Sequence, residues 1–246
     1  MSDVSSRWCD VLDWDSQFWG LTVARLRELP RSREDLVAIT EWCSARGVDL
    51  VMALVPASST SALALLSSSH FEEMDRRLTL VGTPAAASAS TVSTSHTVVR
   101  VAHDGDKSRL GDIASVSHRD TRFYRDRRFP ASRADDLYRQ WITNDIDGRA
   151  DIVLCADVDG VVVGYISLVI NADRATATIS LIAVDPQYVR RGIATSLVRQ
   201  GAMFCADQGV TSLSVATQRD NQRAMAFYHS RGFRVAHEDV WLHRWT

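Results

Sequence analysis

The chain has 246 residues, of which 46% are hydrophobic and 24% are charged, and its formal net charge is −2 at pH 7. These values are ordinary for a soluble globular protein and give no reason to expect nucleic acid or an anionic membrane surface as a partner. The longest strongly apolar run, VVVGYISLVI, is much shorter than the roughly 20 residues that a membrane-spanning helix needs. We therefore expect one large domain or two small ones, with no membrane segment.

The N-terminal segment MSDVSSRWCD lacks the apolar core of a signal peptide. The cysteines are scattered along the chain and form no C-x-x-C pair: they are Cys9, Cys43, Cys155 and Cys205. This usage indicates reduced, mostly buried thiols in a cytoplasmic protein. No Cys or His pair has the spacing of zinc ligands, so we expect no metal site.

The segment before residue 83 alternates between helix and strand patterns. The stretch SREDLVAITEWCSARG predicts a helix that Ser32 caps, with Asp35 in its first turn and Gly47 at its C-terminal stop. It is followed by a buried strand VDLVMALVP, a helix STSALALLSSSH and a strand RRLTLVG. These patterns predict a small N-terminal α/β domain over residues 1–82.

Residues 83–97, TPAAASASTVSTSHT, are small and polar, and Val92 is their only large apolar residue. Such a stretch buries too little apolar surface to order itself strongly, so we interpret it as a linker. The alternative is a long loop within one domain. With the linker, the second domain covers residues 98–246.

The sequence after the linker predicts the order β-α-α-β-β-β-α-β-α-β. It begins with the strand TVVRVA and the helices RLGDIASVSHRD and SRADDLYRQWITN. Asp159-Gly160 between two apolar runs predicts a hairpin, and ATATISLIAV predicts a further strand. A helix between Gly192 and Gly209, the strand TSLSVAT, the short helix NQRAMAFYHSRG and one or two strands in FRVAHEDVWLHRW complete the chain.

The turn between ATATISLIAV and the helix at Gly192 carries little side chain. Gly192 and Ala194 are small, and Arg190 and Arg191 directly precede them. The first N–H groups of a helix have no intrahelical partner, and the helix dipole adds positive potential there. Small residues let an anion reach these amides, so the turn predicts a pyrophosphate site. It is neither a P-loop nor a dinucleotide fingerprint, because both glycine patterns are missing.

The chain resembles the acyl-CoA-binding half of the GNAT superfamily of N-acetyltransferases in two segments, ISLIAVDPQYVRRGIATSLV and LSVATQRDNQRAMAFYHSRGF. The resemblance covers roughly residues 97–246. It implies an α/β (α+β) GNAT fold with a mixed, mostly antiparallel sheet flanked by helices. The sheet would splay open at the cofactor site, after the strand that ends at Val184, and the smaller N-terminal α/β domain would precede it.

The resemblance implies acetyl-CoA as the acyl donor, with its pantetheine arm in the split and paired with the backbone of Ile182 and Val184. A backbone N–H near Ile182 or Ala183 would polarise the thioester carbonyl. The pyrophosphate would bind the amides of Arg190, Arg191, Gly192, Ile193, Ala194 and Thr195. The family pattern usually has Arg or Gln where this chain has Val189, so backbone amides would supply most of the contact.

Tyr228 occupies the position at which a tyrosine of the family points at the thioester sulfur. The resemblance therefore implies a general acid that protonates the departing thiolate, and the alternative is an aromatic ring packed on the sheet. Asn221 either caps its helix or binds the cofactor. The base that takes the amine proton stays open between water and the side chains of His118, Asp120, His229 and His237.

Residues 118–133, HRDTRFYRDRRFPASR, repeat arginine every three residues with aromatic residues among them. The repeat consists of Arg119, Arg122, Arg125 and Arg128, with Phe123, Tyr124 and Phe129. One interpretation is a solvated helix face. In the family, however, this segment builds the acceptor wall, and such a pattern suits a diphosphate with a base or sugar ring. We predict substrate contacts from Arg119, Arg122, Tyr124 and Arg125.

This segment and VLDWDSQFWGLTVARL also resemble the TDP-fucosamine acetyltransferase group, which N-acetylates an amino sugar on a nucleoside diphosphate. We predict an acetyl-CoA-dependent N-acetyltransferase that acts on a primary amine of such a small molecule by direct attack in a ternary complex. The alternatives are another acyl-CoA or a carrier-protein thioester as donor, an amino acid or antibiotic intermediate as acceptor, and a non-catalytic acyl-CoA-binding protein. A homodimer is compatible with the sequence.

Overall fold

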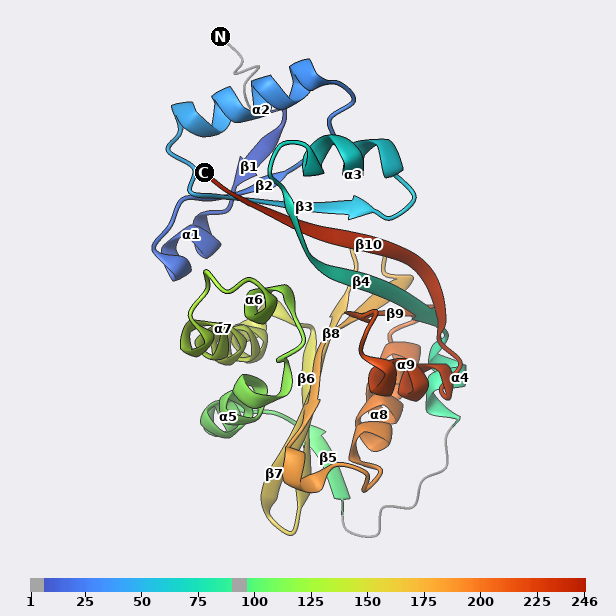
Figure 1. Cartoon of the computed structure of the whole chain (residues 1–246). Helices are drawn as coiled ribbons and strands as arrows, with labels where there is room; N and C mark the ends of the chain where they lie inside the picture. The colour runs from blue at the N-terminus through green and yellow to red at the C-terminus, as the bar shows by residue number, and fades with distance from the viewer. Residues whose placement is uncertain (1–6, 90–96) are drawn as a thin grey trace. The chain divides into compact units, whose positions relative to one another are not determined.

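The computed structural model describes residues 7–89 and 97–246. The chain divides into two compact units, of which the first combines Met1–Arg77 with His237–Thr246 and the second is Leu78–Ala236. The strands β4 (Glu72–Gly82) and β10 (Arg234–Trp245) each contribute to both units (Figure 1). This division differs from the predicted boundaries at 82 and 98, because most of the C-terminal strand belongs to the first unit.

The first unit contains a small sheet with helices packed on it. Its strands are β1 (Cys9–Val11), β2 (Val23–Leu26), β3 (Leu50–Pro56) and the C-terminal part of β10, in that order. β2 and β3 run parallel, whereas β10 pairs antiparallel with β3 from Asp239 to Trp245. The helices of this unit are α1 (Asp13–Trp19), α2 (Arg33–Ala45) and α3 (Thr60–Ser67).

The end of the chain completes the core of the first unit. Ile39 of α2 and Leu66 of α3 pack in one buried cluster with Val51 of β3 and with Val240 and Leu242 of β10. Burying these apolar side chains is favourable, so the C-terminal strand is held here by its hydrophobic face as well as by its ladder with β3. This packing explains why residues 237–246 fold with the N-terminal segment.

The capping predicted for α2 is confirmed. The Ser32 hydroxyl accepts a hydrogen bond from the Asp35 N–H at 3.3 Å, and the Asp35 carboxylate accepts one from the Ser32 N–H at 3.2 Å. This reciprocal pair is a capping box, and it satisfies donors that the first turn of the helix would otherwise leave open.

The second unit contains a mixed, mostly antiparallel sheet, as predicted. Its strand order runs from β9 through β8, β7 and β6 to β5. All neighbouring pairs in this run are antiparallel except β8 and β9, which are parallel. The strands are β5 (Thr97–Val101), β6 (Ile152–Val158), β7 (Val161–Ile170), β8 (Thr176–Val184) and β9 (Ser212–Gln218).

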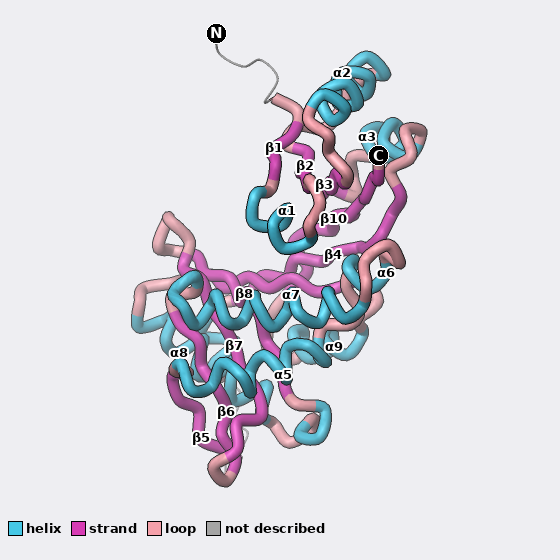
Figure 2. The backbone as a smooth tube through the Cα atoms, turned by 90° about the vertical axis from the view of Figure 1, so that its left-hand side faces the viewer, coloured by secondary structure: helices cyan, strands magenta, loops and turns pink. Residues whose placement is uncertain are grey.

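Helices cover both faces of this sheet, and each face has its own buried apolar cluster. α5 (Lys107–Ser117) and α7 (Ala131–Asn144) pack on one face, which Figure 2 views from the front. α8 (Ile193–Asp207) and α9 (Gln222–His229) pack on the opposite face (Figure 1). The short α6 (Arg122–Arg125) lies between α5 and α7 in the chain. Within the described ranges, no helix is both long and apolar enough to cross a membrane.

Part of the predicted linker over 83–97 is helical. Pro84–Ser88 form α4, which the Thr83 side chain caps, and Ala87 of this helix is buried in the core with α8. Residues 90–96 lie outside the described part of the chain. A buried alanine therefore anchors the start of a segment whose composition alone favours little packing.

Candidate active site

The parallel pairing of β8 with β9 covers only the first part of both strands. It runs from Thr176 opposite Ser212 to Ile179 opposite Val215, although β8 continues to Val184 and β9 to Gln218. The pairing ends where β8 contains a bulge. In the ladder with β7, Ile179 faces Leu168 and Leu181 faces Ser167, so Ser180 is the extra residue of the bulge. A bulge bends its strand and increases the local twist, which separates the two strands from this point onward.

A buried polar group supports the bulge. The Ser167 hydroxyl donates to the Asp145 carboxylate at 2.7 Å and accepts a hydrogen bond from the Leu181 N–H at 3.1 Å. Asp145 is only 1% exposed, and burial raises the pKa of its carboxyl although Arg149 forms an ion pair with it. The side chain of Ser167 thus provides the acceptor for Leu181 at the irregular position.

The register of β8 shows which backbone groups face the split. The Asp185 N–H donates to the Val163 carbonyl at 2.8 Å, so these two residues form a hydrogen-bonded pair. Hydrogen-bonded and non-hydrogen-bonded pairs alternate along an antiparallel ladder, so the next hydrogen-bonded pair joins Tyr165 and Ala183. The N–H and C=O groups of Ile182 and Val184 therefore point away from β7 and into the split, whereas those of Ala183 face β7.

The start of α8 presents a run of backbone donors. Gly192 is the N-cap residue, with φ 79° and ψ −1°, and no side chain at this position accepts from the first N–H groups. Arg190 also has a positive φ of 65°. The first turn closes with the Ser196 N–H donating to the Gly192 carbonyl at 3.0 Å. The N–H groups of 193–195 precede that bond and so lie at the positive end of the helix. Such geometry is typical of an anion site, and we call residues 190–195 the cradle.

The arginines before the cradle differ in their surroundings. Arg190 is exposed, whereas the Arg191 guanidinium lies 4.9 Å from the centre of the Tyr188 ring and donates to the Gln187 carbonyl at 3.3 Å. Ion pairing between Asp185 and Arg109 of α5 supports the same loop, and the Asp185 carboxylate also accepts the Gln187 N–H at 2.8 Å. No pattern in the sequence had indicated Arg109.

Tyr228 is buried on α9, with 4% of its surface exposed. Its ring makes edge-to-face contacts with Phe227 and Phe233, at centroid distances of 5.2 and 5.5 Å. Burial raises the pKa of the phenol, so Tyr228 stays protonated at neutral pH and can donate a proton. Asn221 caps α9, since its side-chain oxygen accepts the Ala224 N–H at 3.0 Å.

The arginines of the segment 118–133 are joined to carboxylates and rings of the protein. Arg119 forms an ion pair with Asp135 at 3.1 Å, and the Tyr124 hydroxyl donates to the same carboxylate at 2.7 Å. Arg125 forms an ion pair with Asp220, in the loop before α9, at 3.0 Å. The Arg122 guanidinium lies 4.1 Å from the centre of the Phe123 ring, and Phe123 and Phe129 are buried.

The candidate bases lie in different settings. His118 stacks on Tyr138 at 4.7 Å and its Nε2 lies 3.1 Å from the Tyr165 hydroxyl, and burial lowers the pKa of its imidazole to about 4. Its neighbour Tyr165 faces Ala183 of β8 in the ladder. Asp120 is exposed, His229 pairs through Nδ1 with the Phe233 carbonyl at 3.2 Å, and His237 lies in the first unit beside Asp239.

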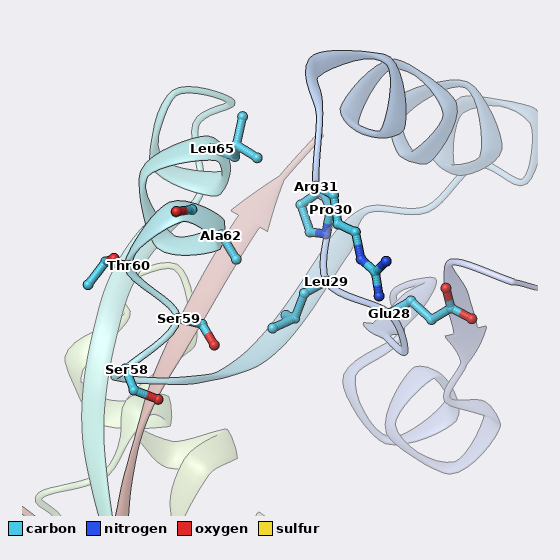
Figure 3. A pocket seen from close by; sticks show the side chains of 10 residues that line it. Glu28, Leu29, Pro30, Arg31, Ser58, Ser59, Thr60, Ala62 and Leu65 are labelled. Carbon is cyan, nitrogen blue, oxygen red and sulfur yellow. The ribbon is translucent and has the colours of Figure 1, made fainter.

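A separate pocket of about 710 Å³ lies within the first unit (Figure 3). Its wall is formed by Glu28–Arg31, Ser58–Ala62 and Leu65. These residues lie on the loop before α2 and at the start of α3, and none of them is a predicted site residue. The split and the cradle of the second unit, with their aligned backbone donors, are therefore the better candidate for chemistry.

Part of the second unit matches a known protein family. Residues 115–233 match the model of the acetyltransferase (GNAT) family. The structure is also similar to that of a GCN5-related N-acetyltransferase from Sphaerobacter thermophilus, with a TM-score of 0.67 and 18% identity, over 96% of this chain and 76% of that one. Residues 115–233, within the second unit, therefore form an acetyltransferase (GNAT) family domain.

The chain is also similar in sequence to two named bacterial proteins. It is 29% identical over 240 residues to the dTDP-fucosamine acetyltransferase of Escherichia coli O6:H1, and this alignment covers 96% of this chain and 97% of the relative. It is 26% identical over 141 residues to the spore coat polysaccharide biosynthesis protein SpsD of Bacillus subtilis. That second match covers 57% of this chain but only 48% of SpsD, so the chain spans about half of that protein.

Proposed function

We propose that the protein transfers the acetyl group of acetyl-CoA to the primary amine of an amino sugar carried on a nucleoside diphosphate. Members of the GNAT family use an acyl-CoA donor. The observation that carries the proposal is the split beyond Ile179, with the backbone of Ile182 and Val184 facing it and the cradle following directly in the chain. The similarity to the dTDP-fucosamine acetyltransferase over nearly the whole chain supports the acceptor class.

The residues present fit a CoA thioester. Unpaired β8 backbone can hydrogen-bond the amide-containing pantetheine arm as a neighbouring strand would, and the amides of 193–195 can bind its diphosphate. A guanidinium from the turn after α9 also lies at the first turn of α8, where Arg231 donates to the Thr195 hydroxyl. Sequence patterns had not singled out Arg231.

In the proposed reaction the neutral amine attacks the thioester carbonyl carbon, and the bond between that carbon and sulfur breaks. The Ile182 N–H faces the split and would donate to the carbonyl oxygen as negative charge develops on it. Tyr228 would give its phenolic proton to the departing sulfur, and the proton lost by the amine would return to the phenolate through water. Burial keeps Tyr228 in the protonated form that this role needs.

For the acceptor, we assign the contacts to Arg119, Arg122, Tyr124 and Arg125, as the resemblance implies. Because Arg119, Tyr124 and Arg125 bind carboxylates of the protein, an incoming diphosphate would compete with Asp135 and Asp220 for them. We place the reaction in the cytoplasm, where the buried free thiols of this chain stay reduced.

The proposal is tested with the purified full chain. Calorimetry should show binding of acetyl-CoA, and CoA release should accelerate with a dTDP-linked amino sugar more than with the free amino sugar or with an amino acid. Binding without CoA release for all three amines would contradict an enzymatic role for these acceptors and support an acyl-CoA-binding protein. Faster release from a longer acyl-CoA would exclude acetyl as the preferred group.

A further inference from the structure

At position 189, the loop before α8 has a side chain that cannot hydrogen-bond a phosphate. Val189 is apolar and 41% exposed, so it offers no donor or charge to an anion at the helix start. The guanidinium of Arg191 lies against the Tyr188 ring. Position 189 therefore adds no charge to the backbone amides of the cradle, and a cation from another element can supply charge there.

Such a cation comes from the end of α9. The Arg231 guanidinium donates through Nη2 to the hydroxyl of Thr195, in the first turn of α8. Through Nη1 it donates to the Ser230 hydroxyl at 2.6 Å and to the Phe227 carbonyl at 3.4 Å, and it stacks 4.2 Å from the centre of the Phe227 ring. Two helices that are far apart in sequence thus meet through this side chain.

The charge of Arg231 is poorly compensated. In residues 7–89 and 97–246, each of the oxygens that accepts from its guanidinium is neutral, and its Nε is buried without a hydrogen-bond partner. Burial also lowers the pKa of this guanidinium, with no carboxylate offsetting the effect. Arg119 and Arg125, by contrast, each pair with a carboxylate. Removing a cation from water without a counter-ion is costly, so an anion beside it would be stabilised.

We propose that Arg231 is a side-chain ligand of the CoA diphosphate, and that it supplies from the turn after α9 the positive charge that the loop lacks at Val189. This inference rests on the proposed function, since it assumes that a CoA thioester binds the cradle. A planar guanidinium can bind two phosphate oxygens at once, and its charge strengthens both hydrogen bonds. Arg231 lies in the turn that follows α9. The same contact with the diphosphate would therefore also hold in place the helix that carries the proposed acid, Tyr228.

The test measures dissociation constants by calorimetry for CoA, 3′-dephospho-CoA and pantetheine, which lacks the diphosphate. Arg231→Leu should weaken CoA and 3′-dephospho-CoA by the same factor, roughly 10- to 100-fold, because one charge-assisted hydrogen-bonding group is lost. Pantetheine binding should stay unchanged. Arg231→Lys keeps the charge and should lose less than Arg231→Leu.

Two further variants separate charge from fold. Val189→Arg in the Arg231→Leu background should recover much of the lost CoA affinity, because it restores a cation at the same cradle. Arg234→Leu is the matched control: this exposed arginine donates to the His229 and Phe233 carbonyls, and its loss should leave CoA affinity unchanged. Melting curves of each variant confirm that it is folded.

The outcomes distinguish this inference from the proposed function. If the wild type binds CoA and Arg231→Leu keeps the same dissociation constant, the assignment to Arg231 is overturned while the cradle stands. Equal weakening of pantetheine and CoA would also overturn it, because that result indicates a packing role. Loss of affinity for CoA but not for 3′-dephospho-CoA would assign Arg231 to the 3′-phosphate instead. A wild type that ignores CoA contradicts the proposed function itself.

Discussion

The cradle at the start of α8 and the arginine segment 118–133 both have the composition of an anion site, but they differ in whether their donors already pair with carboxylates of the protein. In the cradle the donors are backbone N–H groups, and within the described ranges the oxygens that accept from Arg231 beside them are all neutral. In the arginine segment, Arg119 and Arg125 already pair with Asp135 and Asp220. If both regions bind anions as proposed, the cradle offers donors that are already in place, whereas Arg119 and Arg125 must give up their carboxylate partners first.

This difference changes the free energy that each region can contribute to binding. Backbone donors at a helix terminus are held in place by the helix, so a ligand pays little to order them. An arginine in an exposed ion pair gains only the difference between its old and new partners, and such pairs are themselves worth about 0–1 kcal/mol. We therefore expect large effects from changes on the donor side and small ones from changes on the acceptor side.

The largest effect is expected from Tyr228→Phe. Removing the phenolic proton donor should lower kcat roughly 100-fold, the lower range of general acid contributions, while acetyl-CoA affinity hardly changes. Steady-state kinetics together with calorimetry measure both quantities. Phe233→Leu serves as the control for packing around the ring, because Phe233 also contacts the Tyr228 ring. An unchanged kcat in Tyr228→Phe would remove this residue from the mechanism.

The pH dependence of stability tests whether the His118 imidazole is buried and neutral in the folded protein. Its pKa is about 4 in the folded protein and about 6.5 when unfolded, so the stability that it contributes is present above pH 6.5 and is lost as the pH falls toward 4. Partial solvent access reduces the full linkage energy to about 2 kcal/mol. Unfolding free energies of wild type and His118→Gln should therefore converge over this interval, and a constant difference would contradict the buried neutral imidazole.

Gly192→Ala tests the geometry of the cradle. A residue with a Cβ is strained at φ 79° by about 1–2 kcal/mol, so the turn should shift and CoA affinity should fall about tenfold. Gly209→Ala is the matched control, because Gly209 follows the other end of α8 with φ 81°. Both variants should lose similar stability in denaturant unfolding. Equal CoA affinities would show that the cradle does not bind the donor.

The smallest effects are expected at the acceptor side. Arg122→Ala and Arg125→Ala should raise the KM of the nucleotide-linked acceptor a few-fold while the KM of acetyl-CoA stays constant. The ion pair of Arg125 with Asp220 must break before a diphosphate binds, which keeps the effect of Arg125→Ala small. Initial-rate measurements with each substrate varied in turn give both KM values. Equal changes in both KM values would argue against contact with the diphosphate.

Local patterns predicted most of the second unit. The hairpin at Asp159-Gly160, the helix after Gly192 and the strand leading to Val184 all form where turn residues and apolar periodicity place them. The elements that were missed are short or irregular, such as α1, α6 and the bulge at Ser180. Their formation depends on contacts with distant residues, for example Asp145 with Ser167, and no local signal reports such contacts.

The predicted roles divide in the same way. Asn221 is a helix cap and Tyr228 is a buried neutral phenol, both of which local motifs can indicate. The backbone direction of Ala183 follows from the register with β7, which assigns its N–H to that strand and leaves Ile182 as the donor to the split. Arg231 and Arg109 were not found from the sequence, because their partners Thr195 and Asp185 are far away along the chain.

The amino-acid sequence by itself indicated the family of residues 115–233, because its motifs are local: a strand, a glycine turn and a helix in that order place unpaired backbone donors at a helix terminus. Only the tertiary structure decided which charges stay available to a ligand. Whether an arginine is paired depends on the carboxylates that folding brings beside it: Asp220 pairs with Arg125, whereas in the described part of the chain Arg231 donates to neutral oxygens. Such pairings are properties of distance in space, which residue types and spacings do not encode.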